Sequence, residues 1–412
     1  MKTLGSCLLA TGVMAATGLS AATANAQEEL RIGVIGNMTG VFAAFGETMV
    51  EGVEMAVAEA DGTAGDYDIE LTVVDDEGDP ETAITRLERL RTEDEVDVII
   101  GPVSGNIGVA ANDWAGENGM PMVVAYSAPE DITMRDRNHN VVRAGWTGAQ
   151  PMFALGEYAA EQGWKDIVMV GQDYSFPHNQ IGGFLETFCR SGGESVERIW
   201  HPVGSDDFSS ILATLPDADA VMYNGAGTDG VSFFSQYIEF GHGDTPLMGG
   251  SNFYAPGMLP AMGEETVGGI SALQYSEELD TPEHREFRKT YEEMFDRVPM
   301  ATSEHGYVSA KMVIDAVEAI DSKEREPLID ELRATEMPDA PRGPFHLDEY
   351  GNPVQNIYIN EVQKVDGNLR NVPVATYENV SQFGPYEPEE YLDTEPDSRD
   401  FPPGDCSDEY YG

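Results

Sequence analysis

The chain has 412 residues, long enough for two or more domains, and its hydrophobic content of 41% is ordinary for a globular protein. Its 74 acidic residues outnumber 23 basic ones and give a formal net charge of −51 at pH 7. Such a charge repels nucleic-acid phosphates and anionic lipid head groups, so neither is expected to be a partner. Because salt screens repulsion among carboxylates, the composition favours a halophilic acidic surface, with an acidic protein of ordinary habitat as the alternative.

The N-terminus has the layout of a secretory signal peptide. Lys2 is followed by an uncharged run of apolar and small residues over 8–22 and then by Ala24-Asn25-Ala26, an A-x-A cleavage signal. A transmembrane anchor is less favoured, because the run is short for a bilayer that needs about 20 apolar residues. We expect cleavage after Ala26 and a periplasmic or extracytoplasmic mature protein. Its net charge would be −52, because Lys2 is the only charged residue removed.

Two cysteines, Cys189 and Cys406, remain after cleavage. In an exported protein such a pair favours a disulfide, which would tie the C-terminal tail to the body of the protein. Two free thiols are the alternative. Neither cysteine has the spacing of a metal ligand, so no metal or other cofactor is expected.

Strand and helix patterns alternate along the rest of the chain. Strands are expected at 30–35, 71–74, 96–100, 122–125, 166–170, 196–200, 220–223, 246–249 and 354–365. Helices are expected at 47–59, 82–93, 107–119, 152–162, 181–192, 208–215, 231–240, 282–295, 307–320 and 327–335. Asp79-Pro80 is a start signal for the second of these helices. From Gln382 the chain is rich in Pro, Asp, Glu and Tyr, and little regular structure is expected there.

This alternation predicts an α/β fold with two doubly wound lobes, each a parallel sheet covered by helices on both faces. Ligands of such sheets bind outside the carboxyl ends of the strands, where backbone N–H groups and helix N-termini converge. The loops in which a site is expected are those that follow the strands, at 36–46, 101–107, 125–133, 172–179, 224–230 and 249–255.

Segments in and around these loops give the chain a family resemblance. The clearest are IGVIGNMTGVFAAFGETMVEGVEMA, VDVIIGPVSGNIGVAAND, MPMVVAYSAPEDIT, DYSFPHNQIGGF, GTDGVSFFSQYIEFG and PRGPFHLDEYGNPVQNIYINEV. Their order and spacing over about residues 30–380 resemble those of the type I periplasmic solute-binding proteins of ABC transporters, in the leucine/isoleucine/valine-binding branch. The resemblance implies two lobes joined by three crossover segments, near 142–146, 272–276 and 345–352. Lobe 1 is then expected at 27–143 plus 275–346, lobe 2 at 147–272 plus 352–381, and a tail at 382–412.

The resemblance also implies the ligand contacts. The first lobe is expected to contribute Phe45, Ser104, Gly105, Asn106, Ala125, Tyr126 and Ser127. A ligand carboxylate is expected near Ser104, Gly105 and Asn106. The second lobe is expected to contribute Phe176, Gly227, Asp229 and Asn252. Here the sequence departs from the family pattern, because Gly227 stands in place of an aromatic residue. In addition, Asn252 lies near the position of an acid that would bind an ammonium group.

Each contact has a structural alternative. Ser104, Ser127 and Asp229 have the residue types of helix N-caps, and for Asp229 this alternative is the stronger. The aromatic residues suit packing near the hinge or between the lobes.

The resemblance implies a solute-binding protein of an ABC importer, a monomer that captures a small carboxylate-bearing solute by closure of two lobes. Its partners would be that solute and the permease and ATPase complex in the membrane. A branched-chain or other hydrophobic amino acid fits the carboxylate positions, whereas the missing ammonium acceptor leaves an aromatic or other organic acid, or an amide, as alternatives. A ligand sensor is a further alternative. An enzyme is not expected, because the chain has neither a G-x-S-x-G elbow nor a phosphate-binding G-x-x-x-x-G-K-[ST] loop.

Overall fold

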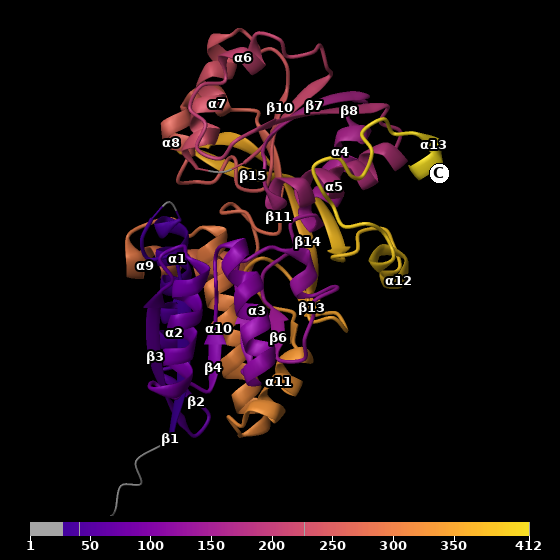
Figure 1. Cartoon of the computed structure of the whole chain (residues 1–412). Coiled ribbons are helices and arrows are strands. Elements are labelled where there is room, and N and C mark those ends of the chain that lie inside the picture. The colour runs from indigo at the N-terminus through magenta and orange to yellow at the C-terminus, as the bar shows by residue number, and fades with distance from the viewer. Residues whose placement is uncertain (1–27, 41, 226, 412) are drawn as a thin grey trace, which may run out of the picture.

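The protein has two lobes, each built on one β-sheet, and the long strand β14 (Pro353–Val365) runs from one lobe toward the other (Figure 1). The computed structural model describes residues 28–40, 42–225 and 227–411. The expected signal peptide and its cleavage site therefore lie outside the described residues. In the described part, no helix combines the length and the apolar character that crossing a membrane would require.

The first lobe contains a six-stranded sheet in the order β2-β3-β1-β4-β5-β6, parallel except for β2. Its strands are β1 (Glu28–Gly36), β2 (Thr63–Ala64), β3 (Tyr67–Asp75), β4 (Val98–Ile100), β5 (Met122–Val124) and β6 (Val141–Arg143). Its helices are α1 (Ala43–Glu59), α2 (Pro80–Thr92), α3 (Gly105–Asn118), α9 (Pro282–Phe295), α10 (Ala301–Ile320) and α11 (Arg325–Arg333).

Side-chain alternation along β1 explains why helices cover both faces of this sheet. Ile32 and Val34 belong to a buried cluster with α1 and α10, whereas Ile35 belongs to a second cluster with α2 and α3. Two glycines let α1 and α10 approach closely. A Cβ atom on Gly52 would lie 1.9 Å from Ser303 O, and one on Gly306 would lie 2.0 Å from Met49 O. The backbones of α1 and α10 therefore pack against each other with no room for a larger side chain at these two positions.

The second lobe contains a nine-stranded sheet in the order β12-β13-β14-β11-β10-β9-β7-β8, with β15 paired to β14. Its other strands are β7 (Asp166–Gln172), β8 (Ser195–His201), β9 (Ala220–Asn224), β10 (Leu247–Gly249), β11 (Ile270–Leu273), β12 (Glu336–Met337), β13 (Phe345–Leu347) and β15 (Asn368–Val380). Helices α4 (Gln150–Glu161) and α5 (Ser175–Arg190) contribute to one core cluster, and α7 (Thr228–Glu239) and α8 (Leu259–Met262) to another. The short helices α6 (Ser209–Leu212) and η2 (Glu264–Thr266) complete the lobe.

The two-lobed α/β fold is confirmed, but the second sheet is mixed rather than purely parallel. Strands β12 to β15 pair antiparallel, and β15 was not predicted. The chain passes between the lobes from β6 to α4, from β11 to α9, and along β13 and β14. Phe345 and Leu347 of β13 belong to the core of the first lobe although their strand pairs with β14 of the second sheet.

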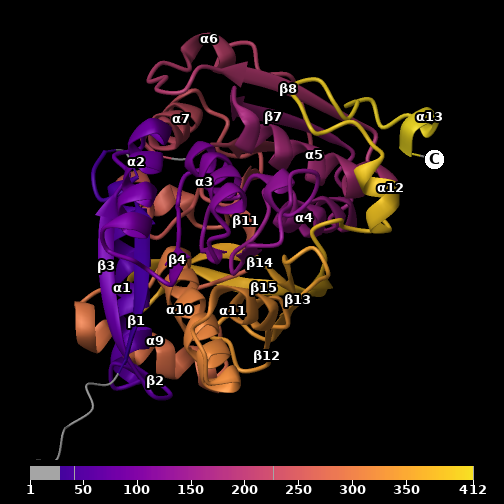
Figure 2. The same cartoon turned by 60° about the horizontal axis from the view of Figure 1, so that its bottom comes forward.

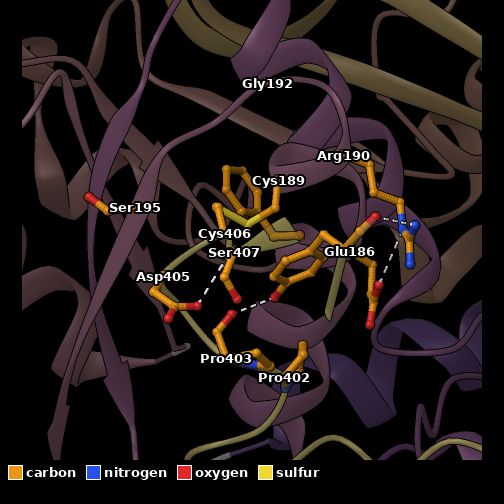
Figure 3. The surroundings of a disulfide bond; sticks show 12 residues. Glu186, Cys189, Arg190, Gly192, Ser195, Pro402, Pro403, Asp405, Cys406 and Ser407 are labelled. Atoms are coloured by element: carbon orange, nitrogen blue, oxygen red, sulfur yellow. Dashed lines mark hydrogen bonds and ion pairs between the residues drawn. A yellow bond between two sulfur atoms is a disulfide. The ribbon is translucent and has the colours of Figure 1, made fainter. Parts of the chain in front are cut away.

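The C-terminal segment 382–411, here called the tail, lies along the second lobe beside α5 (Figure 2). It contains two short helices, α12 (Pro388–Leu392) and α13 (Asp408–Tyr411), and is otherwise irregular. A disulfide joins Cys406 of the tail to Cys189 of α5, with the Cα atoms 4.9 Å apart (Figure 3). The next residue of α5 also holds the tail, because Arg190 Nη1 donates a hydrogen bond to Tyr411 O at 2.6 Å. The tail is thus a packed part of the second lobe.

Candidate functional site

A cleft of about 420 Å³ lies between the lobes. The first lobe lines it with residues at the start of α1, at the start of α3 and in the loop after β5. The second lobe lines it with residues at the start of α5 and with Asn252 after β10. The volume and the mixed aromatic and polar lining are those of a site for a small organic molecule.

A row of aromatic side chains crosses the cleft. The ring of Phe45 in α1 stacks on Tyr126, with centroids 6.2 Å apart and an interplanar angle of 22°. Tyr126 contacts Trp146 at 5.6 Å, and Trp146 meets Phe176 of α5 edge-on at 5.7 Å. Rings in such arrangements offer apolar faces and edges to a flat or hydrophobic ligand body.

Hydrogen bonds fix the middle of this row. Trp146 Nε1 donates to Tyr126 O at 3.1 Å, and Tyr126 Oη donates to Asn252 Oδ1 at 2.8 Å. The second bond joins the two lobes directly. Burial raises the pKa of the Tyr126 phenol, so the hydroxyl stays protonated and remains a donor.

The start of α3 offers hydrogen-bond donors to the cleft. Ser104 is the N-cap residue, but its side chain makes no capping hydrogen bond. Its Oγ is buried and has no partner among the described residues. Gly105 and Asn106 follow as the first helical residues, whose backbone N–H groups have no partner within the helix. Donors at a helix N-terminus favour an anion such as a carboxylate.

Carboxyl groups line another part of the cleft. Glu130 starts the short helix η1 (Glu130–Ile132) and is only 5% exposed, and its Oε1 has no hydrogen-bond partner among the described residues. Burial, reinforced by Asp131, raises the pKa of Glu130 to about 8, although Arg135 and Arg143 act in the opposite direction. The tail contributes Pro396 and Asp397 to the same cleft. This side of the cleft is therefore acidic.

Most of the expected contact residues come together in this cleft, and four do not. Those that line it are Phe45, Ser104, Gly105, Asn106, Tyr126, Phe176 and Asn252. Those outside its lining are Ala125, Ser127, Gly227 and Asp229.

Packing explains the positions of these four residues. Ala125 is completely buried behind the cleft, and Ser127 faces α3, where a Cβ atom on Gly108 would lie 1.9 Å from its Oγ. Gly227 caps α7 with φ 77°. Asp229 is buried in the second lobe, where it accepts hydrogen bonds from Gln172 Nε2 at 2.9 Å and from Gly204 N at 2.7 Å.

Some lining residues were not singled out from the sequence. Trp146 lies in a segment expected as a crossover, and Glu130 lies in the loop 125–133 where a site was expected, so both had a positional signal. Asn179, near the start of α5, had the same kind of signal as the last residue of the loop 172–179. Asp397 had none, because no local pattern shows that the tail reaches the cleft.

Comparisons with known proteins agree with this architecture. A family model described as periplasmic binding protein matches residues 29–368. Leu/Ile/Val-binding protein homolog 6 from Brucella melitensis is 27% identical over 379 residues, which cover 88% of this chain and 95% of the relative.

Two solved structures are similar over nearly their whole length. An ABC transporter substrate-binding protein from Sphaerobacter thermophilus has a TM-score of 0.82 and 28% identity, with 86% of this chain and 99% of that chain covered. A solute-binding protein of an ABC transporter from Rhodopseudomonas palustris BisB5, in complex with 3,4-dihydroxybenzoic acid, has a TM-score of 0.80 and 27% identity. That match covers 86% of this chain and 98% of the other. With the family model matching most of its length and both lobes present, the chain belongs to the periplasmic binding protein family.

Proposed function

We propose that this protein is the extracytoplasmic solute-binding component of an ABC importer and that it binds a small carboxylate-bearing solute between its lobes. One observation carries the proposal: a single cleft joins unpartnered donors at the start of α3 to a row of aromatic rings that reaches the second lobe. The donors suit the carboxylate, and the rings suit an apolar or aromatic body.

The mechanism follows from a site shared between two lobes. A ligand that contacts both lobes stabilises the closed arrangement over the open one by the difference between its contacts in the two states. The closed protein would then deliver the solute to the permease and ATPase complex in the membrane. Export by a signal peptide cleaved after Ala26 would place a monomeric protein outside the cytoplasmic membrane.

Two solute classes fit the cleft. A branched-chain or other hydrophobic amino acid agrees with the name of the Brucella melitensis relative, a Leu/Ile/Val-binding protein homolog. An aromatic acid is the second candidate, supported by the aromatic row and by the 3,4-dihydroxybenzoic acid complex of the Rhodopseudomonas palustris protein.

A thermal-shift panel tests the proposal. The mature protein is melted with L-leucine, L-phenylalanine, benzoate or 4-hydroxybenzoate. A ligand at 100 times its Kd stabilises the folded protein by about 2.7 kcal/mol, which raises the melting temperature measurably. We expect at least one compound to do so. If none of them changes the melting temperature at millimolar concentration, the proposed solute class is wrong.

Variants of the aromatic row show where the compound binds. Phe45→Ala and Phe176→Ala should each reduce the shift strongly while the ligand-free variants still melt cooperatively. Phe240→Ala is the matched control, because Phe240 is 44% exposed and lies at the end of α7, outside the cleft lining. Unchanged shifts in both cleft variants would remove the aromatic row from the site.

A further inference from the structure

The tail forms part of the wall of the cleft, although it lies beyond the region that the family model matches, residues 29–368. Arg135 of the first lobe donates to Tyr391 O at 3.3 Å and to Thr394 O at 3.0 Å. Arg399 of the tail forms an ion pair with Asp173 of the second lobe. Together with the disulfide to α5, these contacts fix the segment between them, which carries Pro396 and Asp397 into the cleft.

Asp397 is packed tightly where it enters the cleft. A Cβ atom on Gly182 of α5 would lie 2.2 to 2.4 Å from the three atoms of its carboxyl group. The side chain of Asn179 hydrogen-bonds to this carboxyl group, and Oδ2 is buried without a partner among the described residues. Burial raises the pKa of Asp397 well above its usual range, and the nearby carboxyl groups of Glu130 and Glu186 raise it further.

Two carboxyl groups that line one cleft, Glu130 and Asp397, therefore each have a buried oxygen without a partner. The guanidinium groups of Arg135 and Arg143 do not serve as partners for these two oxygens. Arg135 is engaged by Asp131 at 3.0 Å and by the two tail carbonyls, and Arg143 donates to Ser127 O and, at 2.7 Å, to Pro129 O.

Glu186, the third acid near Asp397, already has partners. It accepts hydrogen bonds from Tyr386 Oη and, at 2.8 Å, from Tyr410 Oη. Of these three acids, Glu130 and Asp397, on the cleft side of the tail, are thus the two that have a buried oxygen without a partner among the described residues.

We infer that Asp397 of the tail, together with Glu130, binds a cationic nitrogen of the ligand, whose carboxylate lies at the start of α3. This inference rests on the proposed function and narrows its solute class to zwitterions such as α-amino acids, rather than simple aromatic acids. An organic cation is favoured because, among the described residues, no group of three or more His, Cys, Asp or Glu side chains is arranged to hold a metal ion. The aromatic row adds cation–π attraction for such a nitrogen.

Proton linkage gives this subsite a signature. In the empty cleft the two acids hold a proton near neutral pH, because burial raises the pKa of both. Asp131 raises the pKa of Glu130 further, and Glu130 raises that of Asp397. A bound ammonium group favours the charged carboxylates and releases that proton. The affinity for a zwitterion should therefore rise with pH between about 6 and 8, by at most about tenfold per pH unit. An anion without nitrogen should show the opposite trend, since it is repelled when the acids ionise.

The test compares acids with and without the amino group by isothermal titration calorimetry at pH 6 and pH 8. The probes are L-leucine with 4-methylpentanoate and L-phenylalanine with 3-phenylpropanoate. Asp397→Asn removes the tail charge. Gly182→Ala keeps the charge but displaces the carboxyl group. Asp400→Asn is the matched control, because its side chain is exposed and outside the cleft lining.

We expect an amino acid to bind more tightly than its deaminated analogue, with higher affinity at pH 8 than at pH 6. Asp397→Asn and Gly182→Ala should each weaken its binding roughly tenfold or more and flatten the pH dependence, and Asp400→Asn should change neither. The inference is overturned if neither amino acid binds, if the analogues bind as tightly, or if both variants keep wild-type affinity. Binding of the deaminated acids alone would leave the proposed function intact, whereas no binding by any carboxylate would contradict both.

Discussion

Arg342 and Glu304 form a buried ion pair at the junction of the lobes, and we predict that Arg342→Met lowers the free energy of unfolding by about 3–5 kcal/mol. Arg342 Nη1 lies 3.0 Å from Glu304 Oε2, and the side chains are 1% and 0% exposed. Arg342 Nη2 donates to Ala144 O at 2.5 Å, and the guanidinium lies 4.3 Å from the ring centroid of Phe345. The pair thus ties α10 to two of the segments that pass between the lobes.

The expected magnitude follows from burial. Removing the guanidinium leaves the Glu304 carboxyl group without its cation in a site that excludes water, which is the costly case for a buried pair. Burial raises the pKa of Glu304 even with Arg342 in place. Because Arg342 lowers that pKa, the loss of Arg342 favours the protonated acid further. When the pKa of a carboxyl group is higher in the folded protein than in the unfolded chain, the folded protein becomes less stable as pH rises from the unfolded pKa, about 4.3, toward the folded pKa. The effect of Arg342→Met should therefore be smaller at pH 5 than at pH 8.

Urea unfolding followed by tryptophan fluorescence and far-UV circular dichroism measures this effect. Arg285→Met is the matched control, because Arg285 is 59% exposed and its pair with Asp280 lies at the surface, where such pairs contribute about 0–1 kcal/mol. The double variant Arg342→Met/Glu304→Gln removes both charges and should be more stable than Arg342→Met alone. A loss below about 1 kcal/mol in Arg342→Met, or simple additivity in the double variant, would refute the reasoning.

The disulfide, the buried acid Glu277 and the surface charge give three more predictions. Because the bridge closes a loop of 217 residues, Cys189→Ser/Cys406→Ser should destabilise the protein by up to about 5 kcal/mol in thermal or urea unfolding, and unchanged stability would contradict this. Burial raises the pKa of Glu277 to about 7, so ionisation of this carboxyl group destabilises the folded protein as pH rises from about 4.5 to 7. Glu277→Gln should remove this contribution and so reduce the change in the free energy of unfolding over that pH range by up to about 3 kcal/mol. Since 74 acidic residues repel one another, the melting temperature should rise between 0.1 M and 1 M NaCl, and a fall would argue against a salt-adapted surface.

Local signals in the sequence predicted most of the parallel core. Helix α2 is an example: Asp79 accepts a hydrogen bond from Thr82 N at 2.8 Å and Pro80 is the first helical residue, the capping geometry that Asp79-Pro80 indicated. Strand β15 was missed because Pro373 interrupts its pattern, and a proline weakens a strand assignment. The strand forms nonetheless, because the structure pairs β15 with β14 alone and a proline is tolerated in a strand that has a neighbour on one side only. The pairing is antiparallel, with Asn368 opposite Val365 and Val380 opposite Gln355.

The cleft could be predicted only where its residues lie in the loops after the parallel strands. Phe45, Ser104 and Tyr126, which the family resemblance implied, lie in loops where the strand pattern predicted a site, because the carboxyl ends of the strands converge on the cleft. Which side chains of a loop face the cleft depends on packing, and Ser127 turns toward α3 instead. Asp397 depends on the path of a tail held by a disulfide over a long sequence separation, which no local pattern encodes.

Calorimetric titration of the mature protein with the compound that gives the largest thermal shift tests the two-lobed site most directly. We predict one molecule bound per chain, with a Kd of about 1 μM or tighter, and loss of the binding heat in Phe45→Ala/Phe176→Ala while Phe240→Ala binds normally. A different stoichiometry, or full binding by a folded Phe45→Ala/Phe176→Ala variant, would contradict a solute site between the lobes.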